Sequence, residues 1–207
     1  MNNIHKKVSD YYTDKINKHG SVPSGVDWNG VESQHLRFKM LSNIIDYSVD
    51  FSILDFGCGY GAYLDYLNKN AKAQFQYYGL DISDDMLIQA KKNYEGLQSN
   101  ATWIKEIPLD FAVDYTISSG IFNVKLDEPI ETWEAYCLET LNKINAVSKK
   151  GFSFNMLTSY SDAEYMKKYL YYAIPEKIFG HCMNTYSKKV CLDHSYPLYE
   201  FSIMVKK

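Results

Sequence analysis

The segment Ile53-Leu54-Asp55-Phe56-Gly57-Cys58-Gly59-Tyr60-Gly61 combines an apolar run, an acidic residue and three alternating glycines. Twenty positions after its last glycine, Asp81 closes a second apolar segment, residues 77–80. A strand, a glycine turn, a helix, a second strand and an acid are the layout of a nucleotide-binding βαβ unit. The glycines let the backbone turn tightly and approach a ligand, and the second acid can accept both ribose hydroxyls. The sequence therefore predicts a nucleotide site at this turn.

Two kinds of cofactor fit the turn. Gly57, Gly59 and Ala62 match the dinucleotide pattern G-x-G-x-x-G/A, whereas Gly57, Gly59 and Gly61 match the G-x-G-x-G turn of S-adenosylmethionine (SAM) enzymes. Asp55 separates the two, because a dinucleotide would place its pyrophosphate beside this carboxylate. At about 6 Å and an effective dielectric near 20, that repulsion costs roughly 2–3 kcal/mol. SAM carries a cationic ammonium and sulfonium, so the sequence favours SAM and leaves an NAD(P)-dependent oxidoreductase as the alternative.

Residues 53–61 together with Asp81-Ile82-Ser83 resemble the first two motifs of class I SAM-dependent methyltransferases. The resemblance extends along nearly the whole chain to a subgroup of small bacterial methyltransferases that are often associated with surface-polysaccharide (capsule or O-antigen) biosynthesis. The residues that carry this wider resemblance are Tyr11-Tyr12, His19-Gly20, Val26-Asp27-Trp28, Gln34, Arg37-Phe38, Ser119–Asn123, Phe154-Asn155 and Tyr196–Phe201. It implies an α/β fold with a doubly wound, mostly parallel seven-stranded sheet, an antiparallel last strand and an N-terminal helical cover.

Length and charge bound the class of protein. The 207 residues suffice for a substantial core, and no repeat or linker divides them. We therefore expect a single methyltransferase domain, 1–207, with a helical N-terminal cover (1–46) and a Rossmann-like core (47–207). A net charge of −3, with acids and lysines interspersed, provides no basic surface for nucleic acid. A small-molecule substrate is the partner that this composition favours, and the oligomeric state is left open.

Apolar runs and cysteines indicate the compartment. No apolar run approaches the roughly 20 residues that span a bilayer, and residues 1–18 lack a signal-peptide core. The four cysteines show neither a zinc spacing nor a disulfide framework. We expect a cytoplasmic protein with reduced thiols, no metal site and no membrane association.

From residue 51 onward, strand-like runs alternate with helical patterns. Strands are predicted near 51–56, 75–80, 101–105, 113–118 and 151–157, and helices near 61–69, 84–95 and 128–148. Residues 189–194 and 199–205 are strand-like around a turn containing Pro197, which fits an antiparallel seventh strand. Further helices are expected at 3–18, after the capping pair Asn29 and Glu32, and around 161–185 with an interruption at Pro175.

The cofactor should lie beyond the carboxyl ends of the strands, where the strand order switches. The main chain of Gly57 and Gly59 is expected against the amino-acid portion of SAM, with Asp55 near its ammonium. Asp81 should bind the ribose rather than cap the next helix, a role that Ser83 and Asp84 can fill. The predicted cofactor-binding residues are Asp55, Gly57, Cys58, Gly59, Asp81, Ile82, Ser118, Arg37 and Tyr12.

Different parts of SAM are expected to meet Arg37, Tyr12 and Ile82. Arg37 is the only arginine in the chain, and its planar fork suits a carboxylate; a plain surface cation is the alternative. The resemblance assigns Arg37 to the methionyl carboxylate of SAM or to an anionic substrate. Tyr12 belongs to the cover and can flank the sulfonium through a cation–π contact. Ile82 is expected on the adenine, but Glu106 only approximates the acid that usually bonds the adenine amino group, so that contact stays open.

Other residues are candidates for the acceptor pocket and for a general base. Trp28, Phe122, Asn123 and Asn155 are predicted to line the acceptor pocket, with packing or turn roles as the alternative. A general base matters mainly when the acceptor is a hydroxyl or a protonated amine. His194 and His19 are the candidates for that base, although a lone histidine is more often structural.

The sequence thus predicts a SAM-dependent methyltransferase that acts on an oxygen or nitrogen atom of a small polar metabolite and releases S-adenosylhomocysteine. The resemblance makes a capsule or other surface-glycan precursor, including a phosphorylated one, the expected acceptor class. A SAM-binding protein without turnover is a further alternative beside the oxidoreductase.

Overall fold

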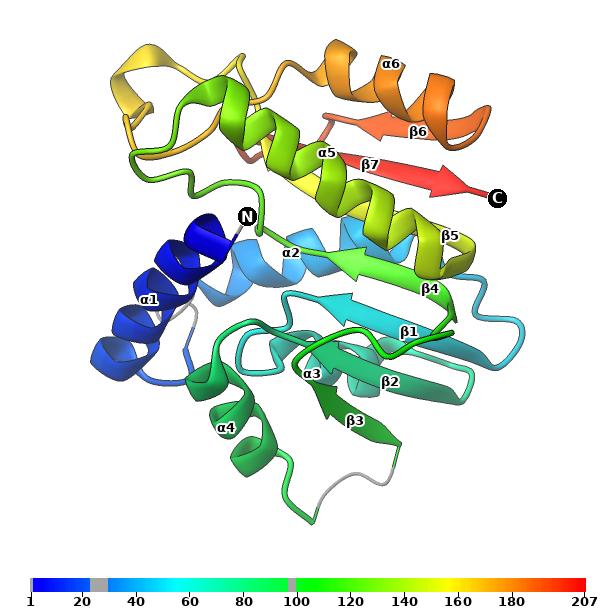
Figure 1. The fold of residues 1–207 in the computed structure, drawn as a ribbon. Coiled ribbons are helices and arrows are strands. Elements are labelled where there is room, and N and C mark those ends of the chain that lie inside the picture. Colours follow the sequence, from blue (N-terminus) through cyan, green and yellow to red (C-terminus); the bar gives the residue numbers. More distant parts are fainter. Residues whose placement is uncertain (1, 23–29, 97–99) are drawn as a thin grey trace.

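A seven-stranded sheet in the order β3-β2-β1-β4-β5-β7-β6 forms the centre of the molecule (Figure 1). The fold comes from a computed structural model that describes residues 2–22, 30–96 and 100–207. The strands are β1 Phe51–Phe56, β2 Phe75–Leu80, β3 Ala101–Ile104, β4 Val113–Ser118, β5 Ser148–Leu157, β6 Lys189–Asp193 and β7 Glu200–Lys206. The first five pair in parallel, and β7 runs antiparallel to β5 and β6. The predicted doubly wound α/β sheet with an antiparallel last strand is confirmed.

Helices cover the sheet and its strand ends. They are α1 Asn2–His19, α2 Val31–Ser42, α3 Ala62–Asn70, α4 Asp84–Asn93, α5 Ile130–Val147 and α6 Pro175–Thr185. The expected N-terminal helices are present as α1 and α2. Asn29, the expected cap of the second one, lies outside the described residues, and Gly30 occupies the N-cap position.

The expected helix over 161–185 is wrong in its first part. Residues 158–174, named here the β5–α6 segment, contain only a short 3₁₀ turn, Ala163–Tyr165. Their backbone bonds outward instead: the Tyr171 N–H donates to the Asn123 carbonyl at 2.8 Å, and the Ala173 N–H donates to the Leu157 carbonyl at 2.9 Å. Pro175 begins α6 rather than interrupting a helix, because its fixed φ suits the first turn and its missing N–H is not needed there.

Apolar side chains fill both faces of the sheet because alternate strand residues point to opposite sides. In β1, Ile53 joins the cluster under α2 and α3, whereas Leu54 joins the opposite cluster with Leu80. A third cluster lies where α5 and α6 cover β5 and β7, around Trp133 and Phe152. Each such side chain contributes roughly 1.5–3 kcal/mol when fully buried. Both faces of the sheet are therefore covered by packed apolar side chains.

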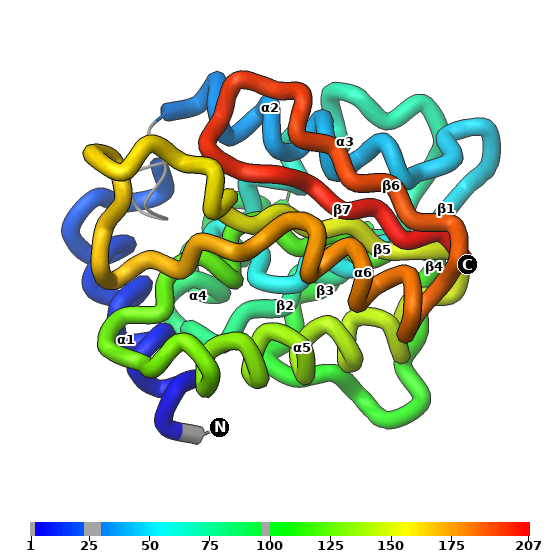
Figure 2. Tube along the Cα trace, turned by 90° about the horizontal axis from the view of Figure 1, so that it is seen from above, coloured from blue at the N-terminus to red at the C-terminus, as the bar shows by residue number. Residues whose placement is uncertain are grey.

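The strand order switches at β1, which pairs with β2 on one side and β4 on the other. The carboxyl ends of the parallel strands lie at the left of Figure 1, where ligands bind in open α/β sheets. Helix α1 and the β5–α6 segment both lie at this edge, as the view from above in Figure 2 also shows.

The described residues contain neither a membrane-spanning helix nor a metal-binding cluster. None of the helices in the described ranges is both long and apolar enough to cross a bilayer. Within the same residues, no cluster of three His, Cys, Asp or Glu side chains could hold a metal ion.

Candidate active site

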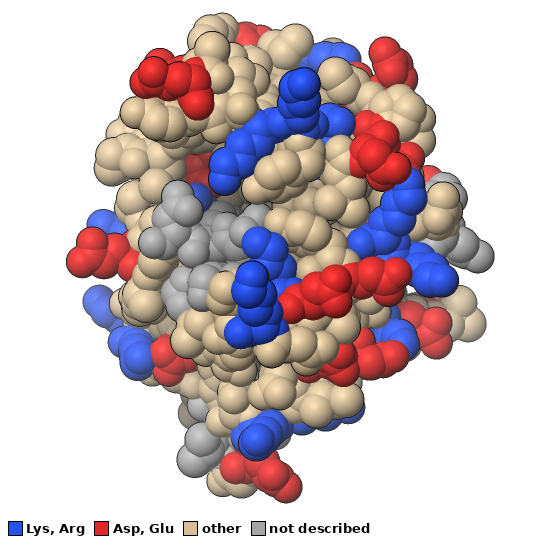
Figure 3. Space-filling model, turned by 90° about the vertical axis from the view of Figure 1, so that its left-hand side faces the viewer, with Lys and Arg blue, Asp and Glu red and all other residues tan. Residues whose placement is uncertain are grey.

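A cavity of about 520 Å³ lies at the carboxyl ends of β1, β2 and β4. This volume falls within the range of roughly 300–1,000 Å³ that is typical of small-molecule sites. Figure 3 shows the molecule from this side, and lysine and acidic side chains are interspersed over the surface rather than gathered in one basic patch. The predicted cofactor residues that line the cavity are Asp55, Gly57, Cys58, Gly59, Asp81, Ile82, Arg37 and Tyr12.

The turn after β1 forms the inner wall. Gly57 has a φ of 87°, and a Cβ there would lie 2.2 Å from Cγ2 of Ile121, so only glycine fits. The N–H groups of Gly57 and Cys58 both donate to the Leu80 carbonyl, at 2.8 and 2.9 Å. The turn is thereby joined to the end of β2, and its main chain forms a surface that a ligand can approach closely.

Asp81, at the end of β2, is held by main-chain donors. Its Oδ2 accepts from the Gly59 N–H and its Oδ1 from the Ser83 N–H, both at 2.9 Å. Burial raises the pKa of Asp81, and these hydrogen bonds oppose the shift. Each carboxylate oxygen has a second lone pair and can still accept a ligand hydroxyl. Ser83, rather than Asp81, caps α4 by accepting from the Met86 N–H at 3.3 Å.

Asp55 presents a buried carboxyl group to the cavity. It is 3% exposed, and the Tyr77 hydroxyl donates to its Oδ2 at 2.7 Å. Burial raises the pKa of Asp55 to about 7, while the bond from Tyr77 lowers it and the charge of Asp81 raises it further. A cationic ligand group beside Asp55 would favour the ionised form.

Arg37 lies in the cavity wall on α2 and is held from behind. Its Nε donates to Oε2 of Glu200 at 2.7 Å, and the two side chains are 8% and 0% exposed. Burial raises the pKa of Glu200, and the adjacent Arg37 guanidinium opposes that shift. Glu200 is not among the predicted site residues, because nothing local to β7 indicates that its first residue meets a helix 163 positions earlier.

Helix α1 covers the cavity and is attached on both sides of it. Val8 and Tyr12 of α1 contribute to the lining. Near one end, Lys7 forms ion pairs with Asp127 and Glu128, at 2.9 and 2.8 Å. Further along α1, Thr13 Oγ1 lies 2.9 Å from Ser83 Oγ at the start of α4. The cover thus connects the loop before α5 with α4.

The outer wall of the cavity was not predicted. It contains Tyr165, Lys167, Tyr169 and Tyr172 of the β5–α6 segment, together with Tyr199 from the turn before β7. The chain has 19 tyrosines, so none of them stands out in the sequence. These five side chains come together only because the β5–α6 segment and the turn before β7 both return to the strand ends.

The acceptor residues predicted around the fourth and fifth strands lie in different places. Asn123 lines the cavity. Phe122 is fully buried in the core under α5, Ser118 Oγ donates to the Phe56 carbonyl at 3.0 Å, and Asn155 Oδ1 accepts from the Gly120 N–H at 2.8 Å. These three residues support the wall from behind and do not line it. The structure therefore places Ser118, predicted to bind the cofactor, and Phe122 and Asn155, predicted to bind the substrate, outside the lining of the cavity.

The two candidate bases lie away from the cavity. His194 Nε2 is 2.9 Å from Thr158 Oγ1, in a shallow depression with Tyr160 and Glu176. His19 is the exposed last residue of α1. No histidine lines the cavity among the residues that the structure describes. Trp28, the remaining acceptor prediction, lies outside the described residues.

Comparison with known proteins identifies relatives of this chain. The family model described as "Methyltransferase domain" matches residues 53–151. A curated protein of Mycobacterium tuberculosis (strain ATCC 25618 / H37Rv), named "Putative methyltransferase Rv1506c", is 47% identical over 164 residues, which cover 79% of this chain and 98% of that protein.

Solved structures share the fold at low sequence identity. Magnesium protoporphyrin IX methyltransferase from Synechocystis PCC 6803, with bound S-adenosylhomocysteine, is 14% identical with a TM-score of 0.57 and covers 85% of this chain and 81% of its own. Human N-acetylserotonin methyltransferase, in complex with SAM, is 13% identical with a TM-score of 0.62, over 83% of this chain and 52% of its own.

Proposed function

The chain belongs to the class I SAM-dependent methyltransferases, and we propose that it methylates an oxygen or nitrogen atom of a small polar metabolite. The observation that carries the proposal is one continuous cavity that joins the glycine turn to a separate outer wall. Such a cavity has room for a cofactor at its inner end and an acceptor at its outer end. We further propose that residues 1–207 act as one domain in which 1–46 is the cover.

The residues at the inner end fit the groups of SAM. Asp81 has lone pairs left for two ribose hydroxyls, and Ile82 offers an apolar surface next to it. Asp55 would face the ammonium, and Arg37, oriented by Glu200, would face the methionyl carboxylate. Each charged group of the amino-acid portion would thus meet a residue of opposite charge. A pyrophosphate beside Asp55 would instead be repelled by its carboxylate.

When bound, the cofactor supplies an electrophilic methyl group, whose transfer to the acceptor leaves S-adenosylhomocysteine. The chain therefore contributes mainly position: it holds the acceptor atom in line and keeps water out. Such orientation can supply roughly 7–11 kcal/mol of the barrier reduction. Val8 and Tyr12 of the covering helix α1 line the cavity, which suits this role. The described lining contains no histidine, so the proton of a hydroxyl acceptor would leave through the partly exposed outer wall, away from the reacting methyl group.

A small polar acceptor fits the outer end of the cavity. Its wall combines tyrosine rings with hydroxyl groups and one lysine, so that it can contact a hydroxylated ring. The sequence resemblance adds a capsule or other surface-glycan precursor, including a phosphorylated one, as the acceptor class that we propose.

Methyl transfer is tested with labelled SAM. Purified protein is first titrated with SAM, S-adenosylhomocysteine and NAD by calorimetry, and it is then incubated with [methyl-¹⁴C]SAM and a panel of sugars and sugar phosphates. We expect binding of the two sulfur cofactors, no binding of NAD, and label in a small-molecule product. Tight cofactor binding with label only in protein or nucleic acid would contradict a metabolite acceptor.

A further inference from the structure

The outer wall contains a lysine whose charge is not matched within the cavity. Of the charged residues in the described lining, Asp55 and Asp81 lie at the cofactor end and Arg37 is paired with Glu200. Lys167 is the remaining one, and within the described residues it forms no ion pair. Other lysines of the chain, such as Lys7 and Lys177, do pair with acids.

The position of Lys167 at the wall is set by its surroundings. Its backbone N–H donates to the Tyr172 hydroxyl at 2.9 Å, and its carbonyl accepts from the Leu170 N–H at 3.0 Å. Leu170 in turn forms a β-bridge with Val124, which also lines the cavity. The Lys167 ammonium lies 5.9 Å from the centre of the Tyr169 ring, which also lines the cavity. The backbone contacts fix where this exposed lysine leaves the chain, and the Tyr169 ring lies within reach of its ammonium at the cavity.

Two exposed rings line the same cavity as this lysine. Tyr165 and Tyr199 are 59% and 46% exposed, and their ring centres are 5.7 Å apart with a tilt of 34°. The Tyr199 hydroxyl donates to Asp162, which joins the β5–α6 segment to the turn before β7. Half-exposed aromatic rings at the mouth of a cavity are suited to cover the apolar face of a ring-shaped ligand, and their hydroxyls suit its polar edge.

We infer that the outer wall is an acceptor subsite for a hydroxylated ring that carries an anionic group, such as a sugar phosphate or sugar acid, with Lys167 binding the anion. This inference rests on the proposed function, because it places the acceptor opposite the cofactor end of the same cavity. An anion at Lys167 completes the charge pairing of the lining. It also gives the acceptor a fixed orientation, since the charged group and the ring occupy different parts of the wall.

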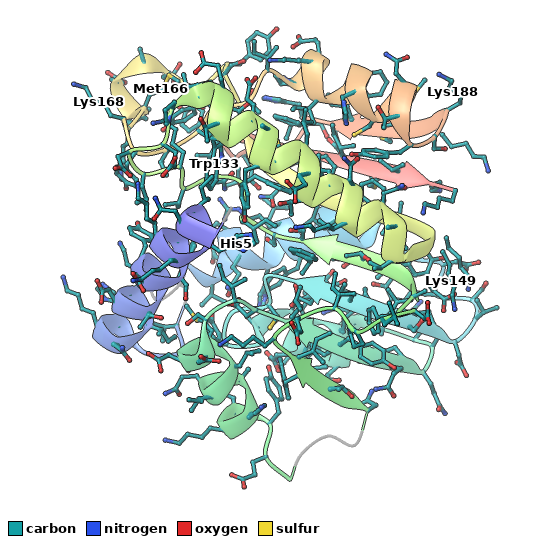
Figure 4. All side chains as sticks on the ribbon, in the orientation of Figure 1. His5, Trp133, Lys149, Met166, Lys168 and Lys188 are labelled. Carbon is teal, nitrogen blue, oxygen red and sulfur yellow. The ribbon has the colours of Figure 1, made fainter. Side chains whose placement is uncertain are left out.

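Neighbouring Lys168 provides the matched control. It has the same charge one position away but does not line the cavity, and Figure 4 shows it pointing away from the body of the molecule. Lys167→Gln and Lys168→Gln therefore remove the same charge from the same segment. Neither substitution touches a residue assigned to the cofactor.

The test measures inorganic phosphate and glucose 6-phosphate binding by ³¹P line broadening in protein saturated with S-adenosylhomocysteine. For each probe, we expect the affinities of the native protein and of Lys168→Gln to agree within about twofold. The affinity of Lys167→Gln should be about tenfold lower. Equal binding by both variants, or no binding to the saturated native protein, would overturn the anion subsite. Calorimetry with S-adenosylhomocysteine on the same samples separates the two proposals: loss of cofactor binding would count against the proposed function instead.

Discussion

Nε of Arg37 donates a 2.7 Å hydrogen bond to Oε2 of Glu200. This buried pair connects α2 to the first residue of β7. Glu200→Gln keeps the shape but leaves the guanidinium without its counter-charge. Removing one partner of a buried pair costs about 3–5 kcal/mol. For a chain of this length, 1 kcal/mol lowers Tm by roughly 2–4 °C, so thermal unfolding should show a loss of roughly 6–20 °C.

An exposed ion pair is the control for this effect. Asp65→Asn breaks the pair with Lys69 on the surface of α3, where both side chains are about half exposed. Such pairs contribute less than about 1 kcal/mol. A Glu200→Gln protein as stable as Asp65→Asn would show that the buried pair does not stabilise α2 against β7.

Asp81→Ala should weaken cofactor binding while the protein stays folded. The substitution removes the acceptor for the Gly59 and Ser83 N–H groups and for the ribose, but Ser83 still caps α4. Loss of hydrogen bonds to a charged group predicts an affinity for S-adenosylhomocysteine lower by roughly 10–150-fold in calorimetry. Asp84→Ala, which removes an exposed acid paired with Lys105, serves as the control. Unchanged affinity in Asp81→Ala would remove this residue from the site.

SAM affinity should depend on pH through Asp55, whose pKa is raised to about 7 by burial. The cationic cofactor favours the ionised carboxylate, so binding weakens as pH falls through 7, by up to about tenfold per unit. An α-amino group titrates at roughly 7.7–8.0 in peptides, so affinity should also fall at higher pH. Calorimetry from pH 5.5 to 9 should therefore give a maximum between the two limbs.

Tyr77→Phe tests whether Asp55 causes the loss of SAM affinity at low pH, the acidic limb of the profile. The variant removes the hydroxyl that lowers the pKa of Asp55, so the limb should move to higher pH. Tyr78→Phe is the matched control, because Tyr78 packs against Phe111 on the other side of the sheet. An acidic limb that is the same in both variants would mean that another group controls the pH dependence.

Two glycines should respond in opposite ways to alanine. Gly57→Ala forces a Cβ to 2.2 Å from Ile121 at a positive φ, so cofactor binding and stability should both fall. Gly180 lies inside α6 with no atom within 4 Å of an added Cβ. Gly180→Ala should stabilise the protein by roughly 0.5–1 kcal/mol, visible as a higher Tm with unchanged cofactor affinity. A tolerated Gly57→Ala would contradict the close approach at the turn.

His194→Gln and His19→Gln should leave cofactor binding and methyl transfer unchanged within about twofold, because both residues lie outside the cavity. The measurement is initial rate with labelled SAM and an acceptor from the panel. A loss of rate without loss of SAM binding in either variant would restore that histidine as a candidate base.

Local pattern determined the sheet and the cofactor end of the site. Apolar runs predicted the positions of β1 and β2. The glycines of the turn after β1 predicted a tight bend, and they have the positive φ angles that such a bend requires. Asp55 and Asp81 follow from the same pattern, since each stands at a fixed position in or next to its strand. The preference for a cationic methyl donor over a dinucleotide came from the charge of Asp55 and agrees with the family of the chain.

Tertiary structure alone decided the outer wall and the support of Arg37. The pairing of Arg37 with Glu200 depends on packing between elements 163 positions apart, which leaves no local periodicity to detect. The tyrosines of the β5–α6 segment line the cavity because the segment does not form a helix. Its backbone instead forms hydrogen bonds with residues 123–126 and 157. His194 lies outside the cavity because of long-range packing too. Its position after a strand predicts which edge of the sheet it occupies, but not which elements pack over it. Long-range contacts of this kind are chosen by the free energy of the whole fold.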